Sequence, residues 1–150
     1  MEAIALAILT TAAAVWIGAI VFQSAIVAPV VFVNLDEASA RVFLRTLFPR
    51  LFKLGLACGA IMAASLAYVG YASGWTTAIT TIALAIVLMV VFGAASLAMV
   101  RHINAAKDAG SAGVARFKQL HRANVSLTML ILLLGIFVLY LIAHRASLGL

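Results

Sequence analysis

The chain has few charged residues, and acidic residues are the scarcest of them. Only 9% of its 150 residues are Asp, Glu, Lys or Arg, and only four are acidic. A soluble domain has about a quarter of its residues charged. Hydrophobic residues make up 67% of the chain, more apolar surface than a water-soluble core of this length can hide. The composition therefore predicts a membrane protein and excludes an ordinary soluble domain.

The chain also lacks the residue patterns of common catalytic sites. Cys58 is the single cysteine, so no internal disulfide and no multi-cysteine metal site can form. The sequence contains no Gly-rich phosphate loop, no HExxH motif and no recognisable pairing of nucleophile and base. All four acids lie at a terminus or in predicted loops, away from the membrane interior where proton- or sodium-coupled carriers place carboxylates: Glu2, Asp36, Glu37 and Asp108. We therefore predict no enzyme activity and no active transport by this chain alone.

Four long apolar stretches remain, and each is long enough to cross a bilayer. They cover about residues 3–33, 54–71, 75–100 and 123–143. The first would be about 46 Å long as a helix against a hydrocarbon core of about 30 Å. Pro29 is expected to bend it, because proline removes an amide donor and crowds the carbonyl four residues earlier. We predict an all-α fold, with residues 1–150 forming one integral membrane four-helix bundle.

Basic residues are concentrated in two short segments. Nine of the ten Lys and Arg residues lie within 41–53 and 101–122. Because short loops rich in Lys and Arg stay in the cytoplasm, the pattern predicts that both termini face the periplasm from a bacterial inner membrane. Basic residues beside membrane spans also favour anionic lipid headgroups as partners, and they argue against nucleic acid.

The two basic loops both show helical patterns. Arg41 and Arg45 lie one helical turn apart among apolar residues, which predicts an amphipathic helix lying in the headgroup region of the first loop. Pro49 is expected to end this helix or to redirect it into the second span. In the second loop, Val114, Phe117 and Leu120 recur at helical spacing, so the fourth helix is expected to begin before the hydrocarbon.

A ladder of small residues follows one face of the second span. Its members are spaced four apart: Gly55, Gly59, Ala63 and Ala67. Small side chains let another helix approach closely. We expect the ladder to pack against a helix of the same chain, with contact between two copies of the chain as the alternative.

A few polar residues within the spans are candidates for a polar intramembrane pocket. Gln23 is expected near the bilayer midplane, with Trp16 on nearly the same face and Ser24 beside it. Asn124 and Thr128 share one face of the fourth helix. These five residues could surround a substrate or water. The alternative is that the Gln23 amide only holds neighbouring helices together.

Two histidines are expected at the cytoplasmic face. His102 ends the third span and His121 precedes the fourth, and imidazole nitrogens at one membrane face could bind haem iron or copper. The alternative is an interfacial histidine bonded to a loop carbonyl or a lipid phosphate. No metal site is predicted, and haem or copper stays an alternative to the absence of a cofactor.

Several short motifs resemble those of a known family. The matching segments are Trp16-Ile17-Gly18 with Phe22, Ala28-Pro29-Val30-Val31-Phe32, Leu47-Phe48-Pro49, and Phe117-Lys118-Gln119-Leu120-His121-Arg122 with Ser126. Together they resemble the domain-of-unknown-function 4149 family, which looks related to the eukaryotic transmembrane protein 205. The resemblance implies a four-span membrane protein of undefined activity with no catalytic residues to carry over. It also suggests that five positions gather near the cytoplasmic face, where the first loop would pack against the start of the fourth helix: Trp16, Pro29, Phe48, Pro49 and His121.

Three functions are compatible with the sequence. The preferred one is a non-enzymatic accessory or assembly subunit of a membrane complex, or a homo-oligomer, because packing surfaces are present and catalytic groups are not. A role in transport of a small molecule or metal is the first alternative. A membrane redox protein that binds haem or copper through His102 and His121 is the second.

Overall fold

The protein consists of four long antiparallel helical segments. The structure, a computed structural model, describes residues 1–144. Its elements are α1 (Glu2–Phe22), the π-helical turn η1 (Gln23–Val27), α2 (Ala28–Asn34), α3 (Glu37–Ser73), α4 (Thr77–Asp108), the 3-10 turn η2 (Gly110–Gly113) and α5 (Val114–Ala143). Since η1 and α2 continue α1, four segments are long and apolar enough to cross a membrane. The predicted all-α, multi-pass membrane fold is confirmed.

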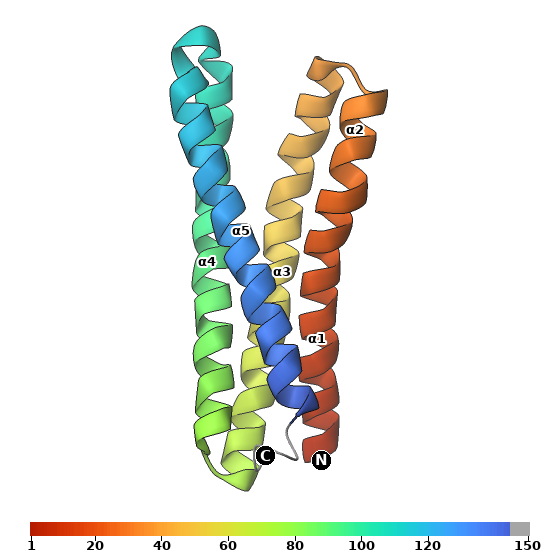
Figure 1. Ribbon diagram of the computed structural model, residues 1–150, viewed down its shortest axis with the longest axis vertical. Helices are drawn as coiled ribbons and strands as arrows, with labels where there is room; N and C mark the ends of the chain where they lie inside the picture. The colour runs from red at the N-terminus through yellow and green to blue at the C-terminus, as the bar shows by residue number, and fades with distance from the viewer. Residues whose placement is uncertain (145–150) are drawn as a thin grey trace.

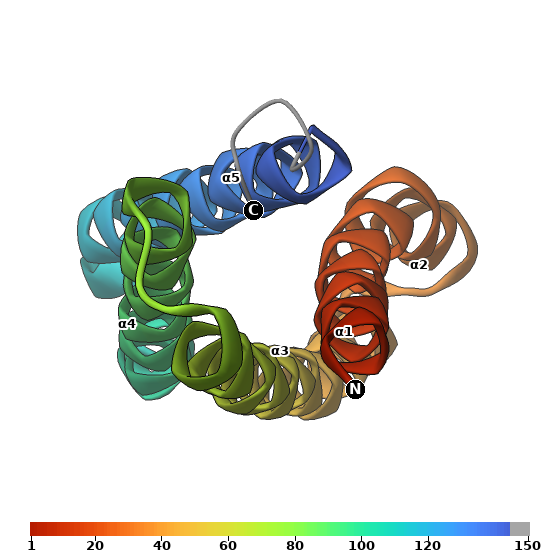
Figure 2. The same ribbon diagram turned by 90° about the horizontal axis from the view of Figure 1, so that it is seen from below.

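The bundle has two different ends. Figure 1 shows the N-terminus, the end of α5 and the α3–α4 turn at one end, and the loops before α3 and before α5 at the other. We call these the terminal end and the basic end. Seen along the bundle, α1, α3, α4 and α5 follow one another around a ring, with α5 returning towards α1 (Figure 2). Near the basic end α5 lies against α4, away from α2 (Figure 1).

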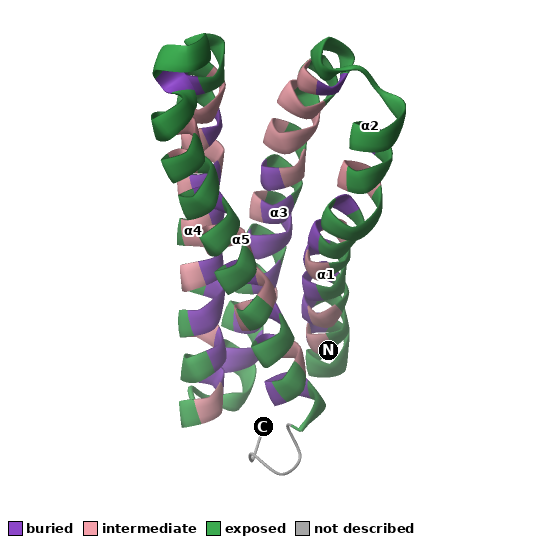
Figure 3. Ribbon diagram, turned by 45° about the horizontal axis from the view of Figure 1, so that its top comes forward, coloured by how far each residue is buried: buried purple, intermediate pink, exposed green. Residues whose placement is uncertain are grey.

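The shared hydrophobic core occupies the half of the bundle nearest the terminal end. Its fully buried side chains come from all four long helices: Leu9, Met62, Ile82, Met89 and Val138. In the most apolar 18-residue stretch of each long segment, only 22% to 39% of the residues are buried. Most residues of each helix therefore lie on its outer surface (Figure 3). These outward side chains are themselves apolar, as expected where the surrounding solvent is lipid.

The first membrane segment contains a π-helical turn in front of Pro29. The backbone N–H of Ala28 bonds to the carbonyl oxygen of Gln23, five residues back. Pro29 has no N–H for the carbonyl of Ala25, and a wider turn is a common way to absorb such a gap. The distortion expected at Pro29 is therefore a π turn over Gln23–Val27, after which the helix continues as α2 to Asn34.

The helix predicted in the first loop is not a separate element. α3 runs without a break from Glu37 to Ser73 and contains Pro49 in its interior. The prediction that Pro49 ends or redirects a headgroup helix was therefore wrong. The helix is held on both sides of the proline, since Arg45 pairs with Asp108 and Phe52 is buried. These contacts offset the hydrogen bond that Pro49 cannot donate.

Both tight connections rest on glycine. Gly74 ends α3 with φ +85°, a conformation that favours glycine, and the Thr76 side chain then accepts a hydrogen bond from the Ile79 N–H at 3.3 Å. At the other end, Gly113 lies against the carbonyl oxygen of Ala106, where any side chain would collide with backbone. α5 begins directly after it at Val114, so the early start of the fourth helix is confirmed.

Candidate functional site

The indole of Trp16 fills a cradle of three glycines in the middle of the bundle. Trp16 is 3% exposed. A Cβ atom added at Gly55 would lie 2.5 Å from the indole Cε2, one at Gly59 would lie 3.0 Å from Cζ3, and one at Gly93 would lie 3.2 Å from Cζ2. Non-bonded atoms do not normally approach so closely. The ring therefore fits only because these three positions of α3 and α4 are glycines without side chains.

Three buried polar side chains lie on the basic-end side of Trp16. They are Gln23, Ser96 and Asn124, with exposed fractions of 9%, 0% and 9%. No other polar or charged side chain is buried in the part of the chain that the structure describes. They come from η1, α4 and α5, and we call this set the polar layer.

The contacts between antiparallel helices fix the depth of each member. Leu56 of α3 lies beside Gly93 of α4, so Ser96 is at the level of residue 53 of α3. Trp16 lies between Gly55 and Gly59, so Gln23, seven residues further, is at the level of about residue 50. Ser96 and Gln23 therefore differ in depth by about 5 Å.

The fourth segment places Asn124 at the same level. Gly113 lies against Ala106 and Gly135 lies within reach of Met89, so Ser96 faces α5 between residues 123 and 128. The polar layer thus spans about two helical turns along the bundle. Sequence reasoning overlooked Ser96, although a lone serine in the uncharged third span was the available signal.

The members of the polar layer differ in their hydrogen bonding. Ser24 is exposed and donates to Gln23 Oε1 at 3.1 Å, and Thr128 donates to the Asn124 carbonyl oxygen at 2.9 Å. Ser96 Oγ and Asn124 Oδ1 are buried and have no hydrogen-bond partner among residues 1–144. A buried polar atom without a partner costs about 1–3 kcal/mol. The layer can therefore accept hydrogen bonds from a further group.

Neither predicted histidine ligand is buried. His102 and His121 are both exposed, and the ring of His121 stacks on Phe117 of its own helix at a centroid distance of 5.5 Å. Within residues 1–144 no three His, Cys, Asp or Glu side chains are grouped so that they could hold a metal ion. Haem or copper binding by this pair stays an untested alternative.

The small-residue ladder divides between two surfaces. Gly55 and Gly59 are buried against Trp16, whereas Ala63 and Ala67 are exposed. Ala63 and Ala67 take no part in the contact with Trp16, and the expected packing at these two positions stays a prediction. A four-residue step turns a helix by about 40° beyond a full turn, so the third and fourth members rotate out of the contact.

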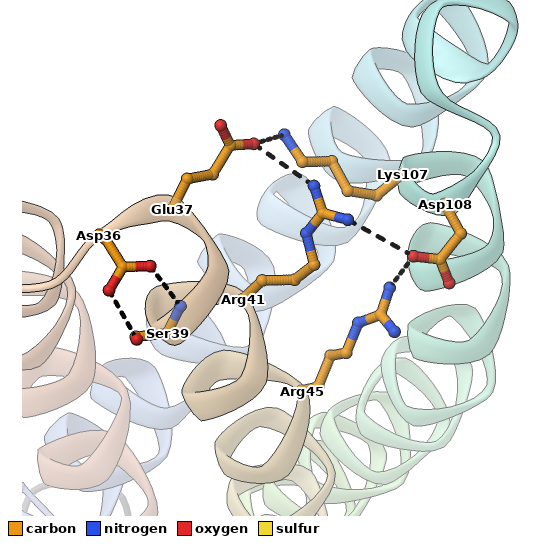
Figure 4. A network of polar contacts seen from close by, with 7 residues as sticks. All are labelled: Asp36, Glu37, Ser39, Arg41, Arg45, Lys107 and Asp108. Carbon is orange, nitrogen blue, oxygen red and sulfur yellow. Dashed lines mark hydrogen bonds and ion pairs between the residues drawn. The ribbon is translucent and has the colours of Figure 1, made fainter.

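A network of ion pairs joins α3 to α4 at the basic end (Figure 4). Arg45 pairs with Asp108, and Arg41 reaches the same carboxylate at 3.7 Å. Glu37 pairs with Arg41 at 3.4 Å and with Lys107 at 3.3 Å. The first turns of α3 therefore pack against the end of α4. Within residues 1–144, no extended contact joins α3 to the start of α5, where the family resemblance suggested packing. Trp16 likewise lies at mid-depth and not at the basic end.

The acids at the start of α3 are stabilised in their charged form. Hydrogen bonds from the backbone and side chain of Ser39 lower the pKa of Asp36, which caps the helix. The hydrogen bond and charge of Lys107, followed by those of Arg41, lower the pKa of Glu37, which lies about 25 Å from the predicted start of the second span. These two carboxylates are therefore charged at neutral pH.

Comparison with protein families gave one match. The model described as "Domain of unknown function (DUF4149)" matches residues 11–112, which include the Trp16 cradle, the ion-pair network and Ser96. Comparison with curated proteins and with solved structures gave no match.

Proposed function

We propose that this chain, which belongs to the DUF4149 family, is a non-enzymatic membrane protein that acts by binding another membrane-spanning chain through the outer face of α3. The partner is a second copy or a subunit of a larger complex. A single observation carries the proposal: the small residues of α3 occupy two opposite faces of that helix, and only one of them is used inside the bundle.

The unused face is a strip of exposed alanines. Ala57, Ala60, Ala64 and Ala67 are all exposed and follow one another at helical spacing, opposite to the buried Met62. The strip is about 15 Å long and lies within the predicted second span. Lipid tails gain little from contact with alanine, whereas a second helix can approach such a face closely and gain dispersion energy. The strip therefore favours a helix–helix contact.

Disulfide trapping in native membranes tests the proposal. The sole thiol, Cys58, is first replaced by alanine, and Ala64→Cys is then introduced on the strip. Leu84→Cys is the matched control, because Leu84 is 60% exposed on α4 and lies at the level of residue 65 of α3. We expect oxidation to trap Ala64→Cys efficiently and Leu84→Cys poorly.

The product identifies the partner. A band at twice the monomer mass supports a second copy, and a band of another mass supports a foreign subunit. Equal trapping at positions 64 and 84 contradicts the proposal, because it reports collision in the bilayer without a specific contact.

The orientation belongs to the same proposal. We infer that the basic end faces the cytoplasm of a bacterial inner membrane and that both termini face the periplasm. Support comes from the two basic segments, which come together at one end of the bundle (Figure 1). In a Cys58→Ala background, a membrane-impermeant thiol reagent applied to intact cells should label a cysteine at Ser73 and not one at Ser111. The reverse labelling pattern contradicts the orientation.

The polar layer supports a second candidate function, binding or passage of a small polar molecule. Ser96 Oγ and Asn124 Oδ1 could accept hydrogen bonds from such a ligand. Against passage across the whole bundle, the Trp16 cradle and the fully buried core lie between this layer and the terminal end. If Asn124→Leu leaves any measured flux unchanged, this candidate fails.

A further inference from the structure

The carboxylates at the basic end are all engaged by α3 and α4. Asp36 caps α3, and Glu37 and Asp108 pair with Arg41, Arg45 and Lys107. The remaining acid, Glu2, lies at the terminal end. Among the described residues, no carboxylate pairs with a cation of α5. The start of α5 therefore carries positive charge that no described carboxylate compensates, and its cations are available to anions from outside the chain.

Two of these cations border a hollow on the outer face of α5. The hollow has a volume of about 390 Å³ and is lined by six residues of one helical face: Ala115, Lys118, Gln119, Arg122, Ala123 and Ser126. All six are exposed, and the buried Asn124 lies on the other side of the helix. Alanine and serine leave the space that the longer Lys118 and Arg122 side chains enclose, one helical turn apart. We call this hollow the α5 groove.

The groove crosses the membrane surface. The fourth span is predicted to begin at about residue 123, so Lys118 and Arg122 lie in the headgroup layer. Ser126 lies about 6 Å deeper than Arg122. A ligand that fills the groove must therefore present negative charge at the surface and uncharged, weakly polar groups further in.

We propose that the α5 groove binds the phosphate headgroup of one anionic phospholipid. Lys118 supplies a compact positive charge, and the Arg122 guanidinium matches the planar, two-pronged geometry of phosphate oxygens. Gln119 supplies a further hydrogen-bond donor beside the phosphate, and the Ser126 hydroxyl faces the glycerol region. The recognised chemistry is phosphate, and the depth of the groove selects the lipid as its source over free phosphate.

Arg116 provides a matched control for this site. It is exposed on the same helix two residues before Lys118, carries the same charge, and does not line the groove. Two residues turn a helix by about 200°, so Arg116 points away from Lys118, and it lies to one side of the groove. Loss of Arg116 lowers the net charge of the basic end by the same amount as loss of Arg122, and only the latter removes a lining residue.

Native mass spectrometry of the full chain tests the site. The protein is titrated with phosphatidylglycerol or phosphatidylcholine, and the lipid adducts are counted. We expect one phosphatidylglycerol per chain, at least a tenfold weaker binding in Arg122→Gln, and a still weaker binding in the double variant Lys118→Gln/Arg122→Gln. Arg116→Gln should change the affinity less than twofold. Far-ultraviolet circular dichroism verifies that all variants remain helical.

Three results would overturn the proposal. Equal weakening by Arg116→Gln would mean that lipid follows net charge and not the groove. Equal binding of phosphatidylcholine would mean that the anionic headgroup is not recognised. Displacement of the lipid by millimolar inorganic phosphate would mean that the groove is a free-phosphate site. The outcome is independent of whether the alanine strip of α3 binds a partner.

Discussion

The indole of Trp16 lies where a side chain of residue 55 would have to be, so the position of Trp16 depends on Gly55 having no Cβ atom. We expect Gly55→Ala to destabilise the bundle by about 1–3 kcal/mol, since overpacking a filled core forces neighbours apart. Unfolding in mixed micelles of increasing denaturing detergent measures this change.

Gly18→Ala is the control for that experiment. Gly18 lies on α1 with nothing within 4 Å of an added Cβ. Alanine is the better helix former by about 1 kcal/mol, so this variant should be neutral or more stable. A Gly55→Ala protein as stable as the wild type would show that the indole can move, and that the cradle does not fix it.

Ser96→Ala tests whether the polar layer is occupied in the working protein. Because Ser96 Oγ is buried without a partner, removing it should leave the free energy of unfolding unchanged or raise it by up to about 1 kcal/mol. Detergent unfolding again provides the measurement. A loss of more than 1 kcal/mol would instead mean that the hydroxyl bonds a water or ligand in the membrane.

Reversal of a charge pair tests the link between α3 and α4. Asp108→Arg should separate the two helix ends, and the added change Arg45→Asp should restore their distance. Spin labels at residues 38 and 105, both exposed, report that distance by pulsed electron paramagnetic resonance. Exposed pairs contribute at most about 1 kcal/mol each, so we expect a local opening without loss of the fold. If the double variant does not restore the distance, groups other than Arg45 and Asp108 hold the ends of α3 and α4 together.

The same labels should reveal a pH dependence at the start of α3. The pKa of Glu37 is lowered from its ordinary value of 4.5 by Lys107 and Arg41, so folding favours the charged carboxylate. Its stabilising contribution is fully present above about pH 4.5 and is lost as the pH falls through the lowered pKa. We expect the distance between α3 and α4 to broaden only in this acidic range. The variant Glu37→Gln should show a smaller pH response.

Pro49→Ala should stabilise α3. The substitution restores an N–H to the carbonyl of Arg45 in a helix that already continues through this position. Proline in a helix interior costs about 3 kcal/mol, so a gain of roughly 1–3 kcal/mol in detergent unfolding is expected. A less stable variant would show that the proline has a packing role at the basic end.

Composition and charge were sufficient to predict the architecture. Four uncharged stretches required four spans. The limit was reached at the prolines. Pro29 and Pro49 each lack the N–H that would bond to the carbonyl four residues earlier. Pro29 is nevertheless preceded by a π turn, whereas Pro49 lies within a regular helix. The difference depends on contacts such as Arg45 with Asp108, 63 residues apart in sequence, which no local pattern reveals.

The candidate site was only partly predictable for a similar reason. Gln23 and Asn124 are conspicuous in apolar spans, and both are buried as a pocket would require. Trp16 was predicted as a pocket residue because it lies on nearly the same helix face as Gln23. Its surroundings, however, are set by glycines on two other helices. Ser96 and the ion-pair network depend on the register between helices, which a single sequence does not contain.

The uneven placement of the hydrophobic core gives the two ends of the bundle different responses to ionic strength. At the terminal end the helices are joined by packed apolar side chains, whose attraction salt does not screen. At the basic end α3 and α4 are joined by exposed charges, and at physiological ionic strength screening acts over about 8 Å. High salt should therefore let the ends of α3 and α4 separate at the basic end while the terminal end stays packed. Low salt should draw the two helix ends together.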